Sequence, residues 1–348
     1  MSTSDGAGLT PRPPSAGQNP LQSPGRDRRH DPLQHQAQNP PPLPRIDKRR
    51  SRQAFERAAP GYDETAVLQR EVGRRLAERL DYVRLDPQAM LDLGSGTGAM
   101  GAHLRRRYPA AWLLSLDFAP AMLRHARGRL SALRRWRRRD AFLCADAESL
   151  PLKPRCLDLV ISNLMLQWCN DLPATFAGLR RTLRPGGLFM FTTFGPDTLR
   201  ELRRSWQAVD DDTHVHAFLD MHDIGDLLLG AGFADPVMDV EYFTLTYAEV
   251  RDLMADLKAL GARNAAEARS RGLLSRRRLR RMIAAYETQR RDGRLPATYE
   301  VIHGHCWAPA ADEARDRPAR IPPQAPGRSP TATVPLSRIG GRGRKGHE

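Results

Sequence analysis

Short apolar runs recur along the middle of this chain, separated by amphipathic stretches of helical period. Runs of this length with little polar interruption are typical of strands buried on both faces of a parallel sheet. Five such runs predict the strands of a doubly wound α/β domain, and two later alternating runs predict a sixth and a seventh strand. The predicted strands cover residues 89–93, 112–116, 141–144, 156–162 and 188–193, and then 237–247 and 297–308.

The stretches between these strands carry apolar residues at helical spacing. In the segment 64–82, for example, Leu68, Val72 and Leu76 form one stripe, which predicts a helix that packs on the sheet by that face. A Pro-Gly pair separates this helix from a shorter one before it. The predicted helices cover residues 51–59, 64–82, 99–107, 121–133, 172–183, 197–209, 224–230, 248–260 and 275–290.

Composition separates a central domain from two tails. Residues 1–45 and 310–348 are rich in Pro, Arg and Gly and poor in aromatic residues. They can bury too little apolar surface to offset the entropy of ordering, so we expect them to be disordered. The predicted parts of the domain at 46–309 are N-terminal helices at 50–82, a core at 88–194, and helical lid insertions at about 195–236 and 248–296.

The first predicted strand ends in an acid and runs directly into a glycine-rich turn. Asp92 precedes Gly94, Gly96 and Gly98, whose missing Cβ atoms allow the backbone to approach a ligand closely. In a doubly wound sheet such a turn borders the ligand crevice beyond the carboxyl ends of the strands. The D-x-G-x-G-x-G spacing differs from the GxGxxG of dinucleotide-binding folds, and it resembles the first motif of class I S-adenosylmethionine (SAM) methyltransferases.

Residues at the ends of the following strands complete the predicted SAM pocket. Asp117 ends the second strand, where a carboxylate can accept hydrogen bonds from both ribose hydroxyls. Phe118 beside it can pack on the adenine, with a plain core ring as the alternative. Asp146 and Ala147 follow the third strand and can bond the adenine amino group and a ring nitrogen. Asn163 ends the fourth strand, where the methyl group is presented.

Four residues near this edge are candidates for binding the methyl acceptor. Gln167 and Trp168 follow the fourth strand, Tyr62 lies between the N-terminal helices, and His216 lies in the first insertion. For Tyr62, a packed ring with a solvated hydroxyl is an equal alternative. His214 and His216 follow three acids, but no third ligand is positioned by the sequence, so no metal site is predicted.

The net charge of +15 is concentrated in two segments, with eight arginines at 124–139 and ten at 263–291. Such clusters attract an acidic partner: nucleic acid, an anionic lipid surface or an acidic protein. A solvated surface is the plain alternative. The second segment offers only Tyr286 for stacking on bases, which makes nucleic acid unlikely. Its candidate docking residues are Arg276, Arg277, Arg278, Arg280 and Arg281.

Membrane and redox features are plain. The chain has no apolar run long enough to span a membrane and no apolar secretory segment at its start. Its four cysteines lack the CxxC or Cys/His spacing of metal ligands, so reduced thiols are predicted, neither disulfides nor zinc ligands. These observations favour a cytoplasmic protein.

Longer segments extend the resemblance beyond the generic SAM motifs. The N-terminal AFERAAPGYDETAVLQREVGRRL and the later SNLMLQWCNDLP, FTTFGPDTLRELRRSWQAVDD, LKALGARN and LPATYEVIHGHCWAP resemble the malonyl-acyl-carrier-protein O-methyltransferases of biotin synthesis. The resemblance covers about residues 45–309. Ser95 stands where that family commonly has Cys, and the arginine-rich segment 124–139 is longer than usual.

This resemblance implies a SAM-dependent enzyme that methylates the free carboxyl of a malonyl group held on acyl carrier protein, the start of pimeloyl and biotin synthesis. The acidic carrier would dock on one or both arginine-rich segments. A carboxylate is already ionised at neutral pH, so its attack on the sulfonium methyl needs no general base. Catalysis would depend mainly on alignment and on the exclusion of water.

Three other functions remain open at this point. Assembly factors of respiratory complex I that modify an arginine of a partner subunit share the FG-x-DTL-x-EL and PATY segments. The intact glycines and the SNLMLQW segment favour methyl transfer instead. The other two are a basic nucleic-acid methyltransferase and a scaffold that binds SAM without turnover.

Overall fold

The computed structural model describes residues 44–137, 139–262, 275–310 and 332–333. Nearly all of the two predicted tails lies outside these ranges. Arg138 and residues 263–274, which include part of each arginine-rich segment and the end of LKALGARN, also lie outside them.

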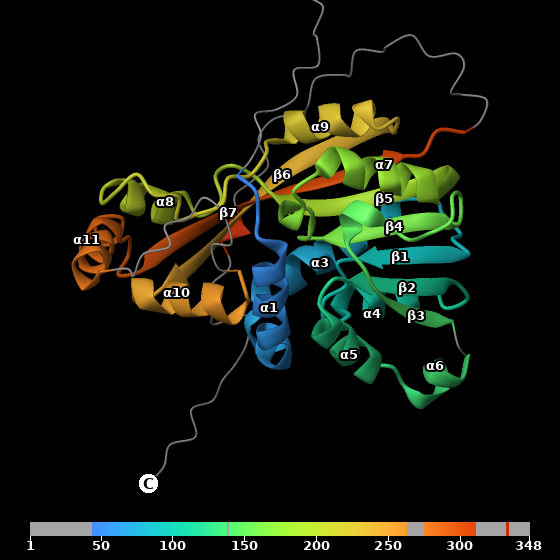
Figure 1. Ribbon diagram of the computed structural model, residues 1–348, viewed down its shortest axis with the longest axis horizontal. Coiled ribbons are helices and arrows are strands. Elements are labelled where there is room, and N and C mark those ends of the chain that lie inside the picture. The colour runs from blue at the N-terminus through green and yellow to red at the C-terminus, as the bar shows by residue number, and fades with distance from the viewer. Residues whose placement is uncertain (1–43, 138, 263–274, 311–331, 334–348) are drawn as a thin grey trace, which may run out of the picture. The chain divides into compact units, whose positions relative to one another are not determined.

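A mixed sheet forms the centre of the described chain, with the strand order β3-β2-β1-β4-β5-β7-β6-β8 (Figure 1). Strands β1 to β5 run parallel, β7 pairs antiparallel with β5, and β6 pairs antiparallel with β7. The predicted doubly wound sheet is confirmed, and the two-residue strand β8 is an addition beside β6. The strands are β1 (Ala89–Leu93), β2 (Trp112–Asp117), β3 (Asp140–Cys144), β4 (Leu157–Asn163), β5 (Leu183–Phe194), β6 (Ala234–Tyr247), β7 (Leu295–Trp307) and β8 (Ala332–Thr333).

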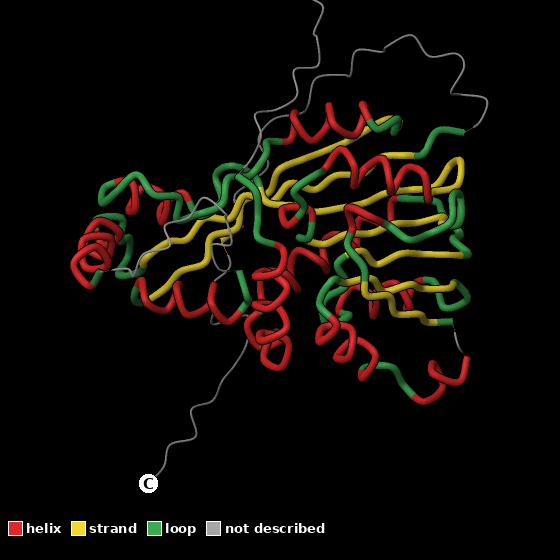
Figure 2. Tube along the Cα trace, viewed as in Figure 1, coloured by secondary structure: helices red, strands yellow, loops and turns green. Residues whose placement is uncertain are grey.

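Helices cover both faces of this sheet (Figure 2). The described helices are α1 (Lys48–Ala58), α2 (Tyr62–Thr65), α3 (Val67–Arg79), α4 (Ala99–Arg107), α5 (Pro120–Gly128), α6 (Ala132–Arg137), α7 (Leu172–Thr182), α8 (Arg200–Gln207), α9 (Met221–Gly230), α10 (Val250–Ala259) and α11 (Arg276–Glu287). Short 3-10 turns include η3 (Ala147–Ser149) and η4 (Leu166–Trp168). Within the described residues no helix combines the length and apolarity needed to cross a membrane.

Successive residues of the central strands face opposite layers, as the pleat of a strand requires. Met90 packs with Leu76 of α3 and Leu104 of α4, whereas Leu91 belongs to the cluster that includes Phe176 of α7. All five of these side chains are at most 1% exposed. A strand with apolar side chains on both faces therefore reads as a continuous apolar run, which is why the sequence located it.

A third apolar cluster lies at the far ends of β6 and β7, where α8, α10 and α11 gather (Figure 1). Trp206 of α8, Leu253 of α10 and Tyr286 of α11 are buried in it. The hydroxyl of Tyr286 donates to the carbonyl oxygen of Pro296 at 2.9 Å, which ties α11 to the start of β7. The helices predicted as lid insertions thus share a core with the strands that carry them.

Two predicted helices are each divided in the structure. The segment 64–82 breaks at Ala66, which leaves helical geometry at ψ 47°. The segment 121–133 ends as α5 at Gly128 and restarts as α6, with the hydroxyl of Ser131 accepting from the N–H of Arg134 at 3.3 Å. Both predictions of one continuous helix were wrong, because apolar periodicity continues across a break that only backbone dihedrals reveal.

Strand β5 begins earlier than predicted. The predicted strand starts at residue 188, after an Arg-Pro-Gly-Gly stretch, yet Leu183 already pairs with Leu157 of β4. Gly186 donates to the carbonyl of Ala308, and Ala308 donates to the carbonyl of Gly187, at 2.7 and 2.8 Å. The pairing with β4 resumes only at Leu188, opposite Leu159, so the two glycines lie in an irregular insert of this ladder that the chain after β7 holds in place.

The strand order places a topological switch at β1. The chain proceeds from β1 outward through β2 to β3 and then returns to β4 on the other side of β1. Ligands of open α/β sheets bind outside the carboxyl ends of the strands at such a switch. The glycine turn after β1 lies there, as the sequence predicted.

The close approach of β5 and β7 gives a stability prediction. Gly304 of β7 pairs with Phe191 of β5, and a Cβ built on Gly304 would lie 2.3 Å from the ring of Phe191. Gly304→Ala should therefore lower the free energy of unfolding by about 1–3 kcal/mol, measured by urea denaturation. Gly230→Ala is the matched control, because a Cβ at this helical position meets nothing within 4 Å. Equal effects of the two substitutions would contradict this reading.

Candidate active site

The glycine turn is held against the end of β2 by backbone hydrogen bonds. The N–H groups of Gly94 and Ser95 both donate to the carbonyl of Leu116, at 2.8 and 2.9 Å. Gly94 and Gly96 have φ angles of +74° and +50°, in the left-handed region that favours glycine. A Cβ on Gly94 would lie 2.2 Å from Met165, so only glycine fits at this position.

Asp117 lies directly beside this turn. Its carboxylate accepts hydrogen bonds from the N–H groups of Gly96 and Ala119, at 2.9 and 2.8 Å. Burial raises its pKa from 3.8 to about 6, and the N–H donors of Ala119, Gly96 and Phe118 limit the rise. The same side chain lines the adjoining pocket, so these hydrogen bonds hold a carboxylate acceptor at the pocket wall.

A pocket of about 860 Å³, its open mouth included, lies beyond the carboxyl ends of β1, β2 and β4. It brings together seven of the nine residues predicted to bind the cofactor. A Cβ on Gly96 would meet nothing within 4 Å, so the backbone there offers an open cradle for a ligand. The seven residues are Gly94, Gly96, Asp117, Phe118, Asp146, Ala147 and Asn163.

The other two predicted residues, Asp92 and Gly98, do not line the pocket. They support the glycine turn from the side away from the pocket. A Cβ on Gly98 would lie 2.9 Å from the Cβ of Ala126 in α5, so glycine allows α4 and α5 to pack closely. Asp92 is 1% exposed. Burial raises its pKa from 3.8 to about 7, although Arg105 opposes the rise and Asp117 adds to it.

Helix α1 contributes residues to the pocket that were not predicted from the sequence. Lys48 contacts Asp146 at 2.6 Å and Glu148 at 2.7 Å. Phe55 packs edge-on against Phe118 and Trp168, with ring centroids 5.8 and 5.0 Å away. The carboxylate of Asp146 is therefore partly occupied by Lys48, and only its remaining lone pairs can serve a ligand. No motif marked Lys48, whose partners lie about 100 residues away.

Asn163 and Tyr62 both line the pocket but differ in what their polar atoms do. The amide of Asn163 accepts from the hydroxyl of Thr192 at 2.8 Å and donates to the carbonyl of Gln69 at 2.9 Å. It holds α3 to the sheet, and its hydrogen bonds stay within the protein. For Tyr62, burial raises the phenol pKa, helped by Asp117 and Asp63, so this hydroxyl stays protonated at neutral pH.

A second and larger pocket of about 1610 Å³, again with its mouth, continues from the first. We call it the chamber. Of the predicted substrate residues, Gln167 and Trp168 line both spaces and His216 lines the chamber. Most of its wall is apolar and comes from α3, α8, α10 and β6, including Leu68, Leu202, Trp206, Leu245, Met254 and Leu257. The boundary between pocket and chamber is lined by Gln69, Gln167, Trp168, Phe194, Leu260 and Ala262.

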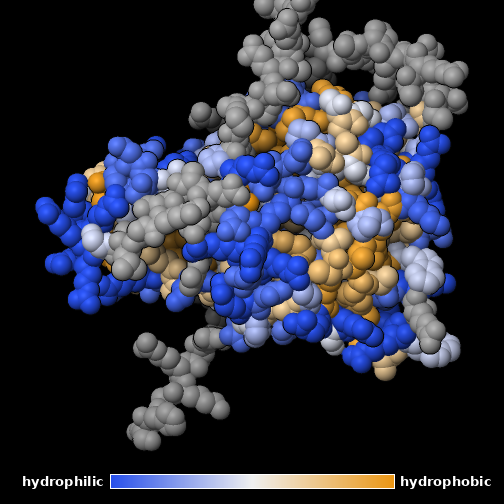
Figure 3. Space-filling model, in the orientation of Figure 1, coloured by the Kyte–Doolittle hydropathy of each residue, from blue (hydrophilic) through white to orange (hydrophobic). Residues whose placement is uncertain are grey.

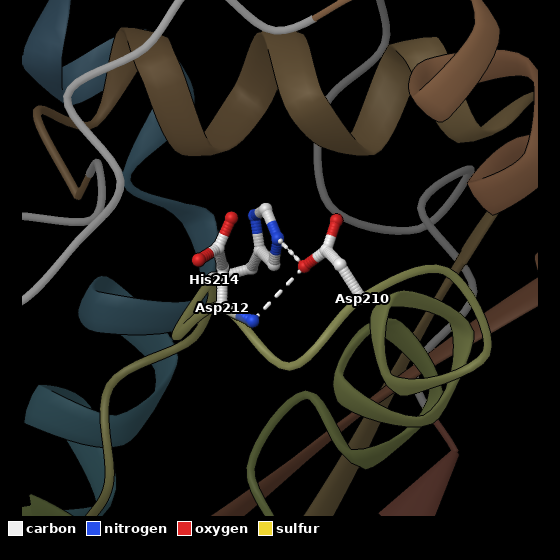
Figure 4. A group of neighbouring side chains, drawn as sticks. All are labelled: Asp210, Asp212 and His214. Atoms are coloured by element: carbon white, nitrogen blue, oxygen red, sulfur yellow. Dashed lines mark hydrogen bonds and ion pairs between the residues drawn. The ribbon is translucent and has the colours of Figure 1, made fainter.

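Asp210, Asp212 and His214 form a group that could offer three ligands to a metal ion (Figure 4). The ring of His214 bonds Asp210 at 2.7 Å and stacks on Trp206 at 3.7 Å between centroids. Arg278 pairs with both carboxylates at 3.1 Å. This guanidinium pairs with both acids, so the group and Arg278 form an ion-pair network beside the chamber, whose wall includes Trp206 and His214.

Five arginines of α11 were predicted to form a docking face, and they divide into two kinds. Arg276, Arg277, Arg280 and Arg281 are exposed, on the hydrophilic surface that Figure 3 shows at the end where α11 lies. Arg278 instead turns inward to Asp210 and Asp212. The exposed face is therefore smaller than the sequence suggested.

Comparison with known proteins agrees with the fold and pocket. Residues 91–191 match a family model described as a methyltransferase domain. With the switch-point pocket, this match defines a class I methyltransferase that uses SAM. The chain is 53% identical over 281 residues to the malonyl-[acyl-carrier protein] O-methyltransferase of Gallionella capsiferriformans, covering 79% of this chain and 96% of the relative. The chain belongs to the malonyl-[acyl-carrier protein] O-methyltransferase family.

Other relatives with the same name give the same result. The Nitrosospira multiformis protein is 54% identical over 277 residues, covering 76% of this chain and 90% of the relative. The Xylella fastidiosa protein is 45% identical over 264 residues, covering 75% of this chain and 88% of the relative. Each match spans most of the relative's length.

The buried carboxyl of Asp92 should make stability depend on pH. Its pKa is raised on folding, so its contribution to stability is present below about pH 4 and is lost as the pH rises through about 7. Asp92→Asn removes this dependence. The unfolding free energy of D92N minus that of the unaltered protein should therefore grow between about pH 4 and about pH 7.5, by on the order of 1–4 kcal/mol. Chemical denaturation at each pH measures it, and a constant difference would contradict the assignment.

Proposed function

We propose that this chain transfers the methyl group of SAM to the free carboxyl of a malonyl group carried by acyl carrier protein. The methyl ester would then enter pimeloyl and biotin synthesis, as the resemblance in the sequence implies. The observation that carries the proposal is the continuity between the glycine-turn pocket and the apolar chamber. A donor and an acceptor held in these two spaces would meet at their shared boundary.

The residues of the pocket suit SAM in shape and chemistry. Gly94 and Gly96 would cradle the methionine end, and Asp117 would accept from the ribose hydroxyls. Phe118 and Ala147 would contact the adenine, with Asp146 sharing its carboxylate between Lys48 and the adenine amino group. Asp92 and Gly98 would support the turn without touching the ligand. SAM, when bound, supplies a sulfonium methyl group that an oxygen nucleophile can take.

On the acceptor side, the chain itself would contribute by positioning the carboxylate and by keeping water away from it. A carboxylate is ionised at neutral pH, so no side chain has to remove a proton from it. The protonated phenol of Tyr62 is a hydrogen-bond donor and cannot act as a base. The largely apolar wall of the chamber would limit water around the acceptor. Correct positioning alone can lower the activation barrier by roughly 7–11 kcal/mol.

Carrier docking would use the exposed arginines of α11. Acyl carrier protein is acidic and its arm carries a phosphate, so an arginine face would speed its encounter with the enzyme more than it strengthens the complex. In the described part of this segment Tyr286 is buried, so no exposed ring there can stack on a base. This disfavours nucleic acid as the partner at α11.

The cellular compartment is part of the same proposal. All four cysteines are free thiols, and persistent free thiols are typical of a reducing compartment. We place the reaction in the cytoplasm on this ground.

A direct assay tests the activity. The protein incubated with methyl-labelled SAM and malonyl-acyl carrier protein should yield a labelled methyl ester that dilute base hydrolyses. Butyryl-acyl carrier protein, which lacks a free carboxyl, is the control and should stay unlabelled. Label on the protein's own arginines, on RNA, or on butyryl-acyl carrier protein would contradict the proposal and favour one of the other functions.

Charge reversal tests the docking face. The double variant R276E/R277E should raise the KM for malonyl-acyl carrier protein about three- to tenfold and weaken its salt dependence. The matched double variant R124E/R127E reverses two exposed arginines of α5 and should have a smaller effect. Arg278 is left intact because it holds Asp210 and Asp212. An unchanged KM with an unchanged salt dependence in R276E/R277E would exclude docking at α11.

A further inference from the structure

The boundary between pocket and chamber is where a methyl donor and its acceptor must come into contact. Three of its residues, Phe194, Leu260 and Ala262, carry no side-chain hydrogen-bonding group. Among the described residues, the polar side chains there are Gln69, Gln167 and Trp168. A carboxylate brought to such an apolar place needs a hydrogen-bond donor, because burial without one is unfavourable.

Two glutamines lie at this boundary, and they differ in whether their amide oxygens are hydrogen-bonded. Gln167 donates to the carbonyl of Leu164 at 2.6 Å and accepts from the hydroxyl of Thr193 at 3.2 Å. Its amide therefore holds η4 to β5. The Oε1 atom of Gln69 is buried and has no hydrogen-bond partner in the part of the chain that the structure describes. Of these two glutamines, Gln69 alone keeps an amide oxygen that no described residue bonds.

A buried amide oxygen without a partner destabilises a protein and calls for a reason. The backbone of Gln69 is fixed, because its carbonyl accepts from Asn163 at 2.9 Å. The side chain is free of this constraint. The same amide also carries an N–H₂ group, which can donate hydrogen bonds to an anion.

We infer that Gln69 binds the acceptor carboxylate and holds it at the boundary for methyl transfer. This inference rests on the proposed function. It moves the substrate contact predicted for Gln167 to a residue in the first turn of α3, which the sequence did not single out within the N-terminal segment of the resemblance. The amide donates to the carboxylate, and Gln167 keeps a structural role beside it.

Variants of near-equal volume separate the two roles. Gln69→Met removes both polar atoms, Gln69→Glu replaces the donor with a negative charge, and Gln167→Met is the structural comparison. The measurements are kcat/KM with malonyl-acyl carrier protein, the Kd for SAM and the Tm without ligand. We expect Q69M to lower kcat/KM at least tenfold and Q69E to lower it further, with the Kd for SAM within twofold. Q69M should keep or raise the Tm, whereas Q167M should lower it.

The outcomes are distinct. A kcat/KM within threefold of the unaltered protein in both Gln69 variants overturns the inference while the proposed function stands. A weaker Kd for SAM in Q69M and a tighter one in Q69E also overturn it, because Gln69 would then bind the cofactor's ammonium group. No methyl ester from the unaltered protein overturns the proposed function and the inference with it.

Discussion

The carbonyl of Leu116 receives the N–H groups of both Gly94 and Ser95, and this pair of hydrogen bonds fixes the turn after β1 against the end of β2. Asp117 follows Leu116 and accepts from Gly96. Backbone cradle and carboxylate are therefore set by one small network, and neither can move without the other. Because β1 lies at the switch of the strand order, this network stands at the only place in such a sheet where neighbouring connections diverge and leave a crevice.

The elements around the ends of β6 and β7 form part of the wall of the chamber. The cluster around Trp206, Leu253 and Tyr286 joins α8, α10 and α11 to β6 and β7, so the helices predicted as a lid are anchored in a core of their own. Arg278 extends this role outward. It pairs with Asp210, which bonds His214, which stacks on Trp206 in the chamber wall. Helix α11 thereby carries exposed arginines on its surface and also holds the wall of the chamber through Arg278.

Residue types in the sequence predicted which side chains lie at the site better than they predicted what each side chain binds. Gln167, Trp168 and Asn163 were expected at the strand edge and lie there, yet the amides of Gln167 and Asn163 bond other parts of the protein. Lys48 occupies part of the Asp146 carboxylate. A motif shows that a polar side chain is near a ligand, but its hydrogen-bond partners come from residues far along the chain.

What the sequence determined by itself was the sheet, its switch and the glycine turn, because buried strands read as apolar runs and a close backbone approach requires glycine. Its long segments also indicated the family. Tertiary structure alone decided that Arg278 faces inward, that α1 completes the pocket, and that the amide oxygen of Gln69 has no partner among the described residues. Local periodicity records which face of an element is buried. It does not show which distant atoms form hydrogen bonds with a polar group. Those hydrogen bonds distinguish a residue that supports the fold from one that is available to a substrate.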